Sequence, residues 1–419
     1  MNIISKSRKL GKLIVGVMTD EAVASYKRVP MLPYDKRANI VENIKGVWKV
    51  VPQHTLDYTD NLKQYKPDIV TNGDDWREGV QKEIRQKVID VLKEWNGKLI
   101  EIPYTKGISS TKIINTIHSE VTTDERLCRL KRLINTKDLV RVIEAHNGLS
   151  ALVAENTKFK DKEFDAIWES SFTDSSSKGK PDIELVDFTS RLQTINEILE
   201  VTTKPMIVDL DTGGQTEHFT YMIKTLERLG VSAVIIEDKK FPKRNSLMQN
   251  AKHEQETITK FCEKIEVGKK AQITKEFMII ARIESYIAGK GITDAMVRAK
   301  AYIQAGADGI MIHSKEPIAH QIVEFCKYYN KLKYKVPLVI VPTTYCTFKE
   351  KEMKSYGINV VIYANHLLRA AYNAMEDVAE DILWLECCDV KEKCKPVRDI
   401  FKVTNKEVLQ FNQSKTSNK

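Results

Sequence analysis

Eight short apolar runs follow one another in the last two thirds of the chain, separated by polar stretches with helical spacing. They are Leu139–Ile143, Phe164–Trp168, Met206–Leu210, Ala233–Ile236, Phe277–Ala281, Gly309–Ile312, Pro337–Val341 and Val360–Tyr363. The runs are continuous and rich in β-branched residues, which favours parallel strands that are covered on both faces. Eight βα units within about 250 residues predict a closed (β/α)8 barrel of the TIM type.

A shorter α/β pattern precedes the barrel. Strand-like runs lie at Leu13–Asp20, Val47–Pro52, Asp68–Thr71 and Lys98–Pro103, and helical stretches at Tyr34–Ile44 and Val80–Trp95. This alternation predicts a small doubly wound domain in residues 1–120. The segment Asp124–Ile134 has apolar residues at helical spacing, so we expect a linking helix within 121–137, the barrel in 138–405 and a polar tail in 406–419.

Composition indicates a soluble globular protein. The chain has 419 residues, 42% of them hydrophobic and 29% charged, and this length favours two domains. No apolar run approaches the roughly 20 residues of a membrane helix. The residues after Met1 are polar and lack the apolar core of a secretory signal. We therefore expect a cytoplasmic protein with no membrane partner.

Neither cysteines nor charge indicate a further ligand. The seven cysteines are scattered, and the close group of Cys387, Cys388 and Cys394 lacks the paired spacing of a zinc site. A net charge of +9 would suit nucleic acid, but the basic residues are interleaved with acids and no nucleic-acid-binding signature accompanies them. Solvated helix faces and anion-binding lysines explain the charge more simply, so we expect no nucleic-acid partner.

Polar side chains follow six of the eight predicted barrel strands. The pairs are Glu144 and His146, Trp168 and Ser170, Asp209 and Asp211, Glu237 and Asp238, Arg282 and Glu284, and His313 and Ser314. Active sites of such barrels lie at the carboxyl ends of the strands. The sequence therefore predicts one polar rim at that end of the barrel.

Asp209 and Asp211 are candidates for a metal site. They are two residues apart at a strand end, so both side chains point the same way. Two carboxylates followed by Thr-Gly-Gly suit Mg²⁺, which keeps several waters and accepts one or two carboxylates. The alternative is that one carboxylate caps the next helix or pairs with a lysine.

The segment Glu237–Ser246 indicates the class of substrate. Two carboxylates leave a buried strand, and a loop follows with four cations, one proline and a terminal Asn-Ser. Such a loop can close over a small, multiply charged anion, which favours an enzyme acting on a phosphorylated carboxylic acid. Glu237 and Asp238 could bind the same ion through water or orient the loop, while an ion pair with Lys239 is the alternative.

Three further features of the rim could bind an anion. Arg282 follows four apolar residues, so its charge must meet an anion or a carboxylate, for which Glu284 is the nearest alternative. His313 could donate to a phosphoryl oxygen or be structural. The segment Trp168–Phe172 offers backbone N–H groups and hydroxyls, which could cradle an oxyanion or carboxylate or form an ordinary turn.

Together these motifs resemble phosphoenolpyruvate mutase, of the isocitrate lyase superfamily, over residues 138–405. The matching segments are Glu144–Ser150, Val208–Gly213, Glu237–Lys239 with Pro242–Ser246, Ala281–Glu284, Met311–Lys315 and Ala364–His366. Any one segment is weak evidence, but the set is highly specific. Two departures bear on fine substrate geometry rather than on reaction class. Ser171 stands where some relatives have glycine, and the Asp209–Gly214 segment lacks a tyrosine between its glycines.

The resemblance implies three groups of site residues. For the metal it implies Mg²⁺ on Asp209, with Asp211, Glu237 and Glu284 supporting the ion and its waters. For the pyruvyl part it implies Trp168, Ser170, Ser171 and Phe172, with Asp182 nearby. For the phosphoryl group it implies Arg282, His313 and Asn245, with Lys243 on the closing loop and Ser246 and Ser314 beside them.

The implied reaction moves the phosphoryl group of phosphoenolpyruvate from oxygen to carbon and gives phosphonopyruvate, reversibly. The implied assembly is a homodimer or homotetramer. Phosphonopyruvate hydrolase is the nearest rival, and Asn245 favours the mutase because it can hold the phosphoryl group while the enolate turns. A carbon–carbon lyase is disfavoured because the loop lacks a Lys-Lys-Cys-Gly-His motif. A non-catalytic module that binds phosphorylated metabolites is a third possibility.

The first domain resembles a cytidylyltransferase of the kind fused to some mutases. The supporting segments are Thr19–Ala22, Lys27–Pro30, Arg37, Gly73–Trp76 and Ile108–Thr111. The last would open a helix whose N-terminus can receive phosphate. The family's first strand and its His-x-Gly-His nucleotide-binding turn should precede Met1 and are absent from the sequence. We therefore expect weak or no nucleotidyl transfer from this domain.

Overall fold

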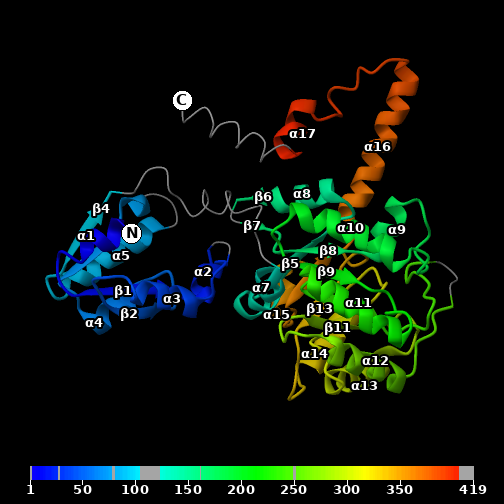
Figure 1. The fold of residues 1–419 in the computed structure, drawn as a ribbon, viewed down its shortest axis with the longest axis horizontal. Coiled ribbons are helices and arrows are strands. Elements are labelled where there is room, and N and C mark those ends of the chain that lie inside the picture. The colour runs from blue at the N-terminus through cyan, green and yellow to red at the C-terminus, as the bar shows by residue number, and fades with distance from the viewer. Residues whose placement is uncertain are drawn as a thin grey trace. The chain divides into compact units, whose positions relative to one another are not determined.

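A computed structural model of the chain describes residues 2–26, 29–77, 81–103, 123–160, 162–248 and 252–404. The sequence segments Lys27–Arg28, Ile108–Thr111 and 406–419 lie outside these ranges. The described residues divide into two compact units, residues 2–103 with 135–137 and residues 123–134 with 138–404 (Figure 1).

The four strands predicted for the first unit are confirmed. They form two parallel pairs, β1 with β2 and β3 with β4. The elements are α1 (Asn2–Ser7), β1 (Leu13–Met18), α2 (Asp20–Ala24), α3 (Tyr34–Glu42), β2 (Val47–Gln53), α4 (Thr59–Tyr65), β3 (Ile69–Gly73), a 3₁₀ turn (Asp74–Arg77), α5 (Lys82–Lys93) and β4 (Lys98–Ile102). A small core around Trp76, Val88 and Leu92 packs α4 and α5 together.

The second unit is a closed barrel of eight parallel strands, as the sequence predicts. The strands follow chain order around the barrel, and β14 closes on β5. They are β5 (Val140–Glu144), β8 (Ala166–Glu169), β9 (Met206–Asp209), β10 (Ala233–Glu237), β11 (Met278–Ile283), β12 (Gly309–Ile312), β13 (Leu338–Ile340) and β14 (Val360–Tyr363). Because both faces of the barrel wall are covered, nearly every strand residue is buried.

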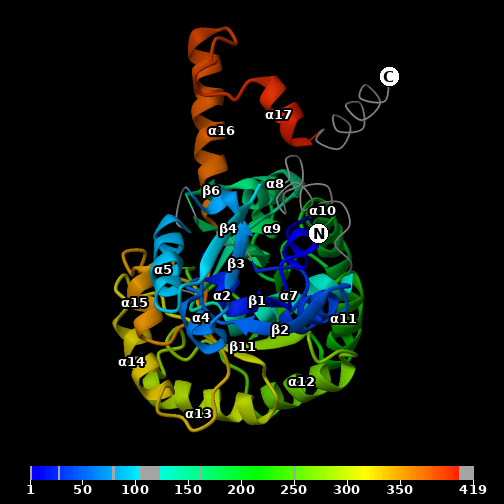
Figure 2. The same cartoon turned by 90° about the vertical axis from the view of Figure 1, so that its left-hand side faces the viewer.

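Helices cover the outside of the barrel (Figure 2). They are α7 (Thr123–Thr136), α8 (Gly148–Asn156), α9 (Ser171–Ser177), α10 (Phe188–Val201), α11 (Thr216–Leu229), α12 (Ile258–Ala271), α13 (Gly291–Gln304), α14 (His320–Tyr329) and α15 (Glu350–Ser355). Two further helices, α16 (His366–Leu385) and α17 (Val397–Thr404), follow the last barrel strand. A short hairpin, β6 (Lys158–Phe159) and β7 (Lys162–Glu163), precedes β8. In α11, Phe219, Ile223 and Leu226 form the buried stripe, and Gly230 ends the helix at φ 85°.

The segment predicted as a linking helix packs on the barrel unit along most of its length. Leu127, Leu130 and Leu133 of α7 are buried. The guanidinium of Arg126 donates hydrogen bonds of 3.1 Å to the carbonyls of Leu199 and Thr202 at the end of α10. These contacts make α7 part of the barrel's outer layer.

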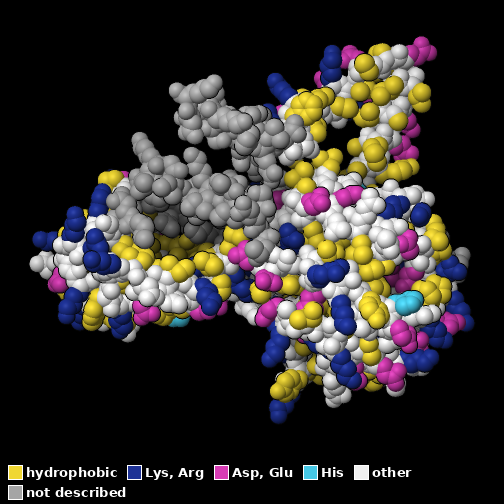
Figure 3. All heavy atoms as spheres, in the orientation of Figure 1, with side chains coloured by type: hydrophobic (Ala, Val, Ile, Leu, Met, Phe, Trp, Pro, Cys, Tyr) yellow, Lys and Arg dark blue, Asp and Glu magenta, His cyan; other side chains and the backbone are white. Residues whose placement is uncertain are grey.

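The helix after the last barrel strand differs from the others. None of the 20 residues of α16 is buried, although its first turn is held by Glu144, which accepts from the backbone N–H groups of Leu367 and Leu368. Figures 1 and 2 show α16 extending beyond the barrel. It exposes Leu383 and Trp384, which are 79% and 81% accessible, and Figure 3 shows hydrophobic side chains along it.

Among the described helices, none is long and apolar enough to cross a lipid bilayer.

Candidate active site

The carboxyl ends of β8 to β12 bring the polar groups of the sequence motifs to one rim. Asp209 ends β9 and Glu237 ends β10, while Arg282 is the last but one residue of β11. The register of the barrel pairs Glu237 with Arg282, so their side chains leave the wall side by side. The predicted rim is therefore a consequence of parallel strands ending at the same level.

A buried lysine cluster surrounds Lys243 and comprises Ser171, Asp182, Asp209 and Asp211. The Nζ of Lys243 lies 2.5 Å from Oδ1 of Asp211 and 3.2 Å from Oδ1 of Asp182. It also donates a 2.9 Å hydrogen bond to Oγ of Ser171, which in turn donates to Oδ2 of Asp209 at 2.9 Å. The predicted metal, pyruvyl and loop residues thus meet at one point.

A second, arginine cluster comprises Arg282, Glu284, His313, Ser246 and Glu237. The Nε of Arg282 donates to Oε1 of Glu284 at 2.5 Å, and its Nη2 donates to Oγ of Ser246 at 3.0 Å. Oε2 of Glu237 lies 3.3 Å from Nη2 of Arg282. Nδ1 of His313 lies 2.7 Å from Oε1 of Glu284 and 2.8 Å from the same guanidinium.

Electrostatics link the two clusters. Burial opposes ionisation of Asp209, but the charges of Lys243 and Arg282 outweigh it and lower the pKa of this carboxyl. Burial likewise opposes ionisation of Glu284, yet Arg282 and Lys239 hold its pKa well below the usual value. Burial and the Arg282 charge lower the pKa of His313, so its imidazole is neutral at pH 7. The site thus offers cations already paired with carboxylates.

The loop after β10 supplies side chains to both clusters. Lys243 and Ser246 reach the two clusters, and Asn245 donates a 2.5 Å hydrogen bond from Nδ2 to Oδ2 of Asp182. Lys239, at the root of the loop, donates to Oγ of Ser246 at 2.5 Å and to the carbonyl of Arg244 at 3.0 Å. The loop therefore lies closed over the rim, as expected of a lid.

Four predicted substrate residues lie outside these bonded clusters. Trp168 is buried in β8, Ser170 precedes α9, and Phe172 is half-buried in its first turn. The hydroxyl of Ser314 donates to Oε1 of Gln321 at 2.6 Å. Within the described ranges, the indole Nε1 of Trp168 is buried without a hydrogen-bond partner, and the side chain of Ser170 makes no capping bond to α9.

Two residues that the sequence did not indicate support the lysine cluster. Arg191 of α10 is buried and donates to Oε2 of Glu169 at 2.5 Å and to Oδ2 of Asp211 at 3.2 Å. Glu184 accepts from Thr212 through Oε1 and from the backbone N–H of Lys243 through Oε2. The only feature of the sequence that could have indicated Glu184 as a site residue is its position two residues after Asp182.

Asp238, the second carboxylate of the loop motif, is bonded to residues of the barrel and its outer helices. Its carboxylate accepts hydrogen bonds from Arg298, Tyr302 and Gln255 and from the backbone N–H of Glu284. Asp238 therefore supports the barrel wall, a role that differs from the water-mediated ion binding, loop orientation and Lys239 ion pair considered from the sequence.

The rim oxygens suit a hydrated hard cation. Among the described residues, no group of three or more His, Cys, Asp or Glu side chains has the arrangement of a metal-ion site. However, both carboxylate oxygens of Glu237 are buried without a hydrogen bond in that part of the chain, and burial raises the pKa of Glu237 to about 7. Their charged neighbours are Nζ of Lys239, 3.6 Å from Oε1, and Nη2 of Arg282, 3.3 Å from Oε2, so the ion pair with Lys239 that the sequence left open is present. Such oxygens match the ligand preference of Mg²⁺, which binds through few carboxylates and several waters.

Comparisons with known proteins identify the class. The sequence model described as phosphoenolpyruvate phosphomutase matches residues 130–383, the part of the chain that forms the barrel and its rim. A phosphoenolpyruvate phosphomutase of Tetrahymena pyriformis is 35% identical over 300 residues, 71% of this chain and 97% of the relative. The chain belongs to the phosphoenolpyruvate phosphomutase family.

Solved structures agree with this assignment. A phosphoenolpyruvate phosphomutase from Streptomyces platensis subsp. rosaceus is 34% identical, with a TM-score of 0.64 over 68% of this chain and 98% of that chain. A phosphonopyruvate hydrolase in complex with oxalate and Mg²⁺ is 32% identical, with a TM-score of 0.62 over 70% and 99%. Both confirm the predicted barrel and leave the choice between the two reactions open.

The resemblance of the first unit is confirmed as well. The sequence model described as cytidylyltransferase-like matches residues 1–116.

Proposed function

We propose that the barrel interconverts phosphoenolpyruvate and phosphonopyruvate. In this reaction the P–O bond of phosphoenolpyruvate breaks, the electron pair forms a pyruvate enolate, and the enolate carbon then forms the P–C bond. No proton is gained or lost overall, and no protein nucleophile is needed. Catalysis depends on positioning and on stabilising charge, as in other phosphoryl transfers.

The observation that supports this proposal best is that Lys243 from the loop and Arg282 from the barrel wall both act on the buried carboxylate of Asp209. Asn245 is bonded in the lysine cluster and His313 in the arginine cluster. We assign Arg282, His313 and Asn245 to the phosphoryl group and Lys243 to its developing negative charge. When substrate enters, its anionic oxygens would replace some of the carboxylates that Arg282 and Lys243 now contact. Charge-assisted bonds of this kind are the strong ones.

We assign the pyruvyl part to the start of α9. The hydroxyl of Ser170, which makes no capping bond to α9, together with backbone N–H groups at Ser171 and Phe172, suits a carboxylate. The buried indole Nε1 of Trp168, which has no hydrogen-bond partner among the described residues, is a further donor in this assignment. Ser246 and Ser314 stand at the phosphoryl side in this assignment. The closed loop would exclude water, which otherwise would capture the phosphoryl group.

We assign the cation site to Asp209, with Asp211, Glu237 and Glu284 orienting its waters. Mg²⁺ bound there would offset negative charge on the enolate and carboxylate oxygens of the substrate. The relative solved with oxalate and Mg²⁺ supports the choice of Mg²⁺ as the cation.

A phosphonopyruvate hydrolase is the second candidate, because a hydrolase of Variovorax sp. is 36% identical over 251 residues. The experiment that separates the two is phosphorus NMR of the purified protein with phosphonopyruvate and Mg²⁺. The mutase gives phosphoenolpyruvate, whereas inorganic phosphate as sole product would replace the proposal with the hydrolase. Binding of sulfopyruvate without any turnover would indicate a non-catalytic binding module.

We also propose that the chain assembles as a homodimer or homotetramer. The exposed apolar residues of α16 and α17 support this, because exposed apolar patches mark interaction sites.

A further inference from the structure

Lys264 of α12 binds the backbone of the turn that follows β9. Its Nζ donates a 2.7 Å hydrogen bond to the carbonyl of Thr212 and a 2.6 Å hydrogen bond to the carbonyl of Gly214. Lys264 is half-buried, and burial lowers the pKa of its ammonium group. A buried ammonium group is costly unless it is paired and hydrogen-bonded. Among the described residues no carboxylate forms an ion pair with Lys264, so the two carbonyls are its hydrogen-bond partners there.

The turn itself has an uncommon backbone conformation. Asp211 lies at φ 55°, Gly213 at φ 74° and Gly214 at φ 59°. A residue other than glycine keeps a left-handed conformation only where the surrounding structure holds it there. Asp209 and Asp211, which we assign to the cation and its waters, lie at the start of this turn. The contacts that hold the turn therefore also decide where these two carboxylates point.

Two charged side chains hold the turn at Thr212. Glu184 accepts hydrogen bonds from the N–H and the hydroxyl of Thr212, while Lys264 donates to its carbonyl. The stem of Lys264 packs on the turn as well, because a Cβ atom added at Gly213 would lie 3.3 Å from Cδ of Lys264 and 3.1 Å from Cδ2 of Phe219. Lys264 thus contacts the turn through both its stem and its ammonium group.

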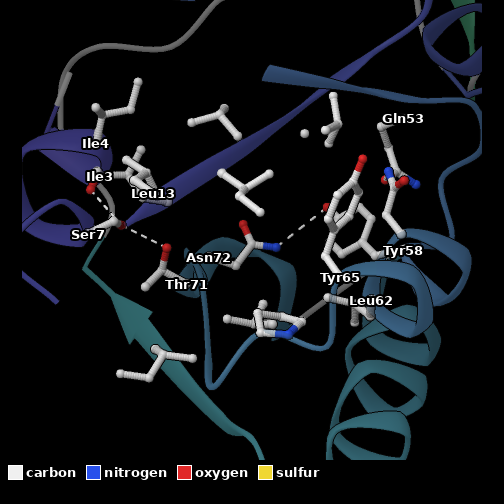
Figure 4. A pocket seen from close by; sticks show the side chains of 18 of the residues that line it. Ile3, Ile4, Ser7, Leu13, Gln53, Tyr58, Leu62, Tyr65, Thr71 and Asn72 are labelled. Atoms are coloured by element: carbon white, nitrogen blue, oxygen red, sulfur yellow. Dashed lines mark hydrogen bonds between the residues drawn. The ribbon is translucent and has the colours of Figure 1, made fainter. Parts of the chain in front are cut away.

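The cavity of about 410 Å³ in the N-terminal unit offers no comparable charged group (Figure 4). None of the described residues that line it is Asp, Glu, Lys or Arg. Polar groups in its wall bond to one another or to backbone, as in the 2.7 Å contact between the hydroxyls of Ser7 and Thr71 and the 2.8 Å bond from Gln53 to the carbonyl of Thr55. Lys264 is the more informative group, because its charge is directed at a functional turn.

We propose that Lys264 is a positioning residue of the cation site, which fixes the turn after β9 so that Asp209 and Asp211 point to the cation. Lys264 acts through the carbonyls of Thr212 and Gly214 and touches neither cation nor substrate. Residues that orient the ligands of a metal typically contribute about 10–100-fold to its affinity. This inference rests on the assignment of the cation to Asp209 in the proposed function.

Binding of Mn²⁺ to the full chain tests the proposal, since Mn²⁺ shares the preference of Mg²⁺ for carboxylate and water ligands. Lys264→Met keeps an unbranched stem but removes both hydrogen bonds, and Lys264→Arg keeps the charge and the donors. We expect Lys264→Met to raise the Kd of Mn²⁺, measured by electron paramagnetic resonance, about tenfold or more. Lys264→Arg should restore most of the affinity. Lys260→Met, at an exposed site one turn earlier on α12, should bind Mn²⁺ like wild type.

A merely structural role would lower the urea midpoint of Lys264→Met and leave the Mn²⁺ affinity of the folded protein unchanged. Lys264→Gln, whose side chain is too short for both bonds, provides the same test should the methionine variant not fold. Asp209→Asn separates this inference from the proposed function. If Asp209→Asn abolishes Mn²⁺ binding while Lys264→Met binds like wild type, the positioning role is wrong and the cation site stands. If Asp209→Asn binds like wild type, the cation site is wrong and the role of Lys264 with it.

Amide hydrogen exchange of the metal-free protein gives a second readout. The N–H of Gly213 donates to the carbonyl of Leu210 within the turn, so its exchange reports whether the turn keeps its conformation. We expect exchange at Gly213 to be at least tenfold faster in Lys264→Met than in Lys260→Met, with exchange in β12 unchanged. Equal rates at Gly213 in the two variants would overturn the proposal, because the turn would then not depend on Lys264.

Discussion

The backbone N–H of Lys243 donates a 2.7 Å hydrogen bond to Oε2 of Glu184. The other oxygen of Glu184 accepts from both the N–H and the hydroxyl of Thr212, which follows β9. One carboxylate therefore ties the closed loop to the barrel rim. Burial and the nearby charge of Asp211 raise the pKa of Glu184, which agrees with its place beneath the loop.

Replacing Glu184 should loosen the closed loop without removing a group that we assign to substrate. A lost bond to a charged acceptor is worth about 1.5–3 kcal/mol, so we expect Glu184→Ala to lower turnover roughly tenfold or more. Because water then enters, the ratio of inorganic phosphate to phosphoenolpyruvate should rise in the phosphorus NMR spectrum. Glu200→Ala, at an exposed site on α10, is the control. An unchanged product ratio would show that Glu184 does not hold the loop.

Asn245 should matter for isomerisation more than for folding. Its Nδ2 donates to Asp182 and its Oδ1 accepts from the N–H of Leu247. In the proposed reaction the amide holds the migrating phosphoryl group, and loss of one such donor costs about 100-fold or more in kcat. We expect Asn245→Ala to show that loss in a continuous assay, with thermal unfolding near wild type. Asn196→Ala on the exposed face of α10 serves as comparison, and wild-type turnover of the Asn245 variant would remove Asn245 from the mechanism.

The strands and the rim could be predicted because their determinants are local. Continuous β-branched runs such as Ala233–Glu237 specify buried parallel strands, and the residues that follow them must then meet at one end of the barrel. The hydrogen bond by which Arg191 supports Asp211 could not be predicted in this way. Arg191 belongs to an ordinary amphipathic helix, and its bond to Asp211 depends on how α10 packs beside β9.

The sequence also did not predict that α16 extends away from the barrel. Its residues have helical periodicity like those of the other barrel helices, and only packing decides which surface its apolar side chains meet. Figure 3 shows that hydrophobic side chains along α16 lie exposed among polar ones. The same holds for the division of the first unit into two parallel strand pairs, because strand pairing is a non-local property.

Exposed apolar residues at the end of α16 should hold subunits together. Leu383 and Trp384 are 79% and 81% accessible, and burial of two such side chains contributes about 3–6 kcal/mol. We expect the double substitution Leu383→Ser with Trp384→Ser to shift the mass measured by light scattering toward 48.0 kDa, the mass of one chain. Glu380→Ser, on the same exposed helix, should leave the mass unchanged. If the wild-type chain itself measures 48.0 kDa, the proposed assembly is wrong.

The barrel should lose stability at alkaline pH through Cys326. Burial in α14 raises the pKa of this thiol from 9.0 to about 12. Between these values the folded state keeps a proton that the unfolded state has lost, so stability is intact below pH 9 and falls by about 1.4 kcal/mol per pH unit above it. Cys326→Ala should be less stable than wild type at pH 7, because it leaves a small cavity.

That deficit is expected to shrink as pH rises from 9 to 11, since the variant has no thiol to deprotonate at this position. Urea unfolding followed by fluorescence at pH 7, 9, 10 and 11 measures the difference between the two proteins. Cys388→Ala is the matched control, because Cys388 is exposed and its removal should leave the pH dependence of stability as in wild type. A constant difference between Cys326→Ala and wild type across this range would show that the Cys326 thiol does not titrate differently in the folded barrel.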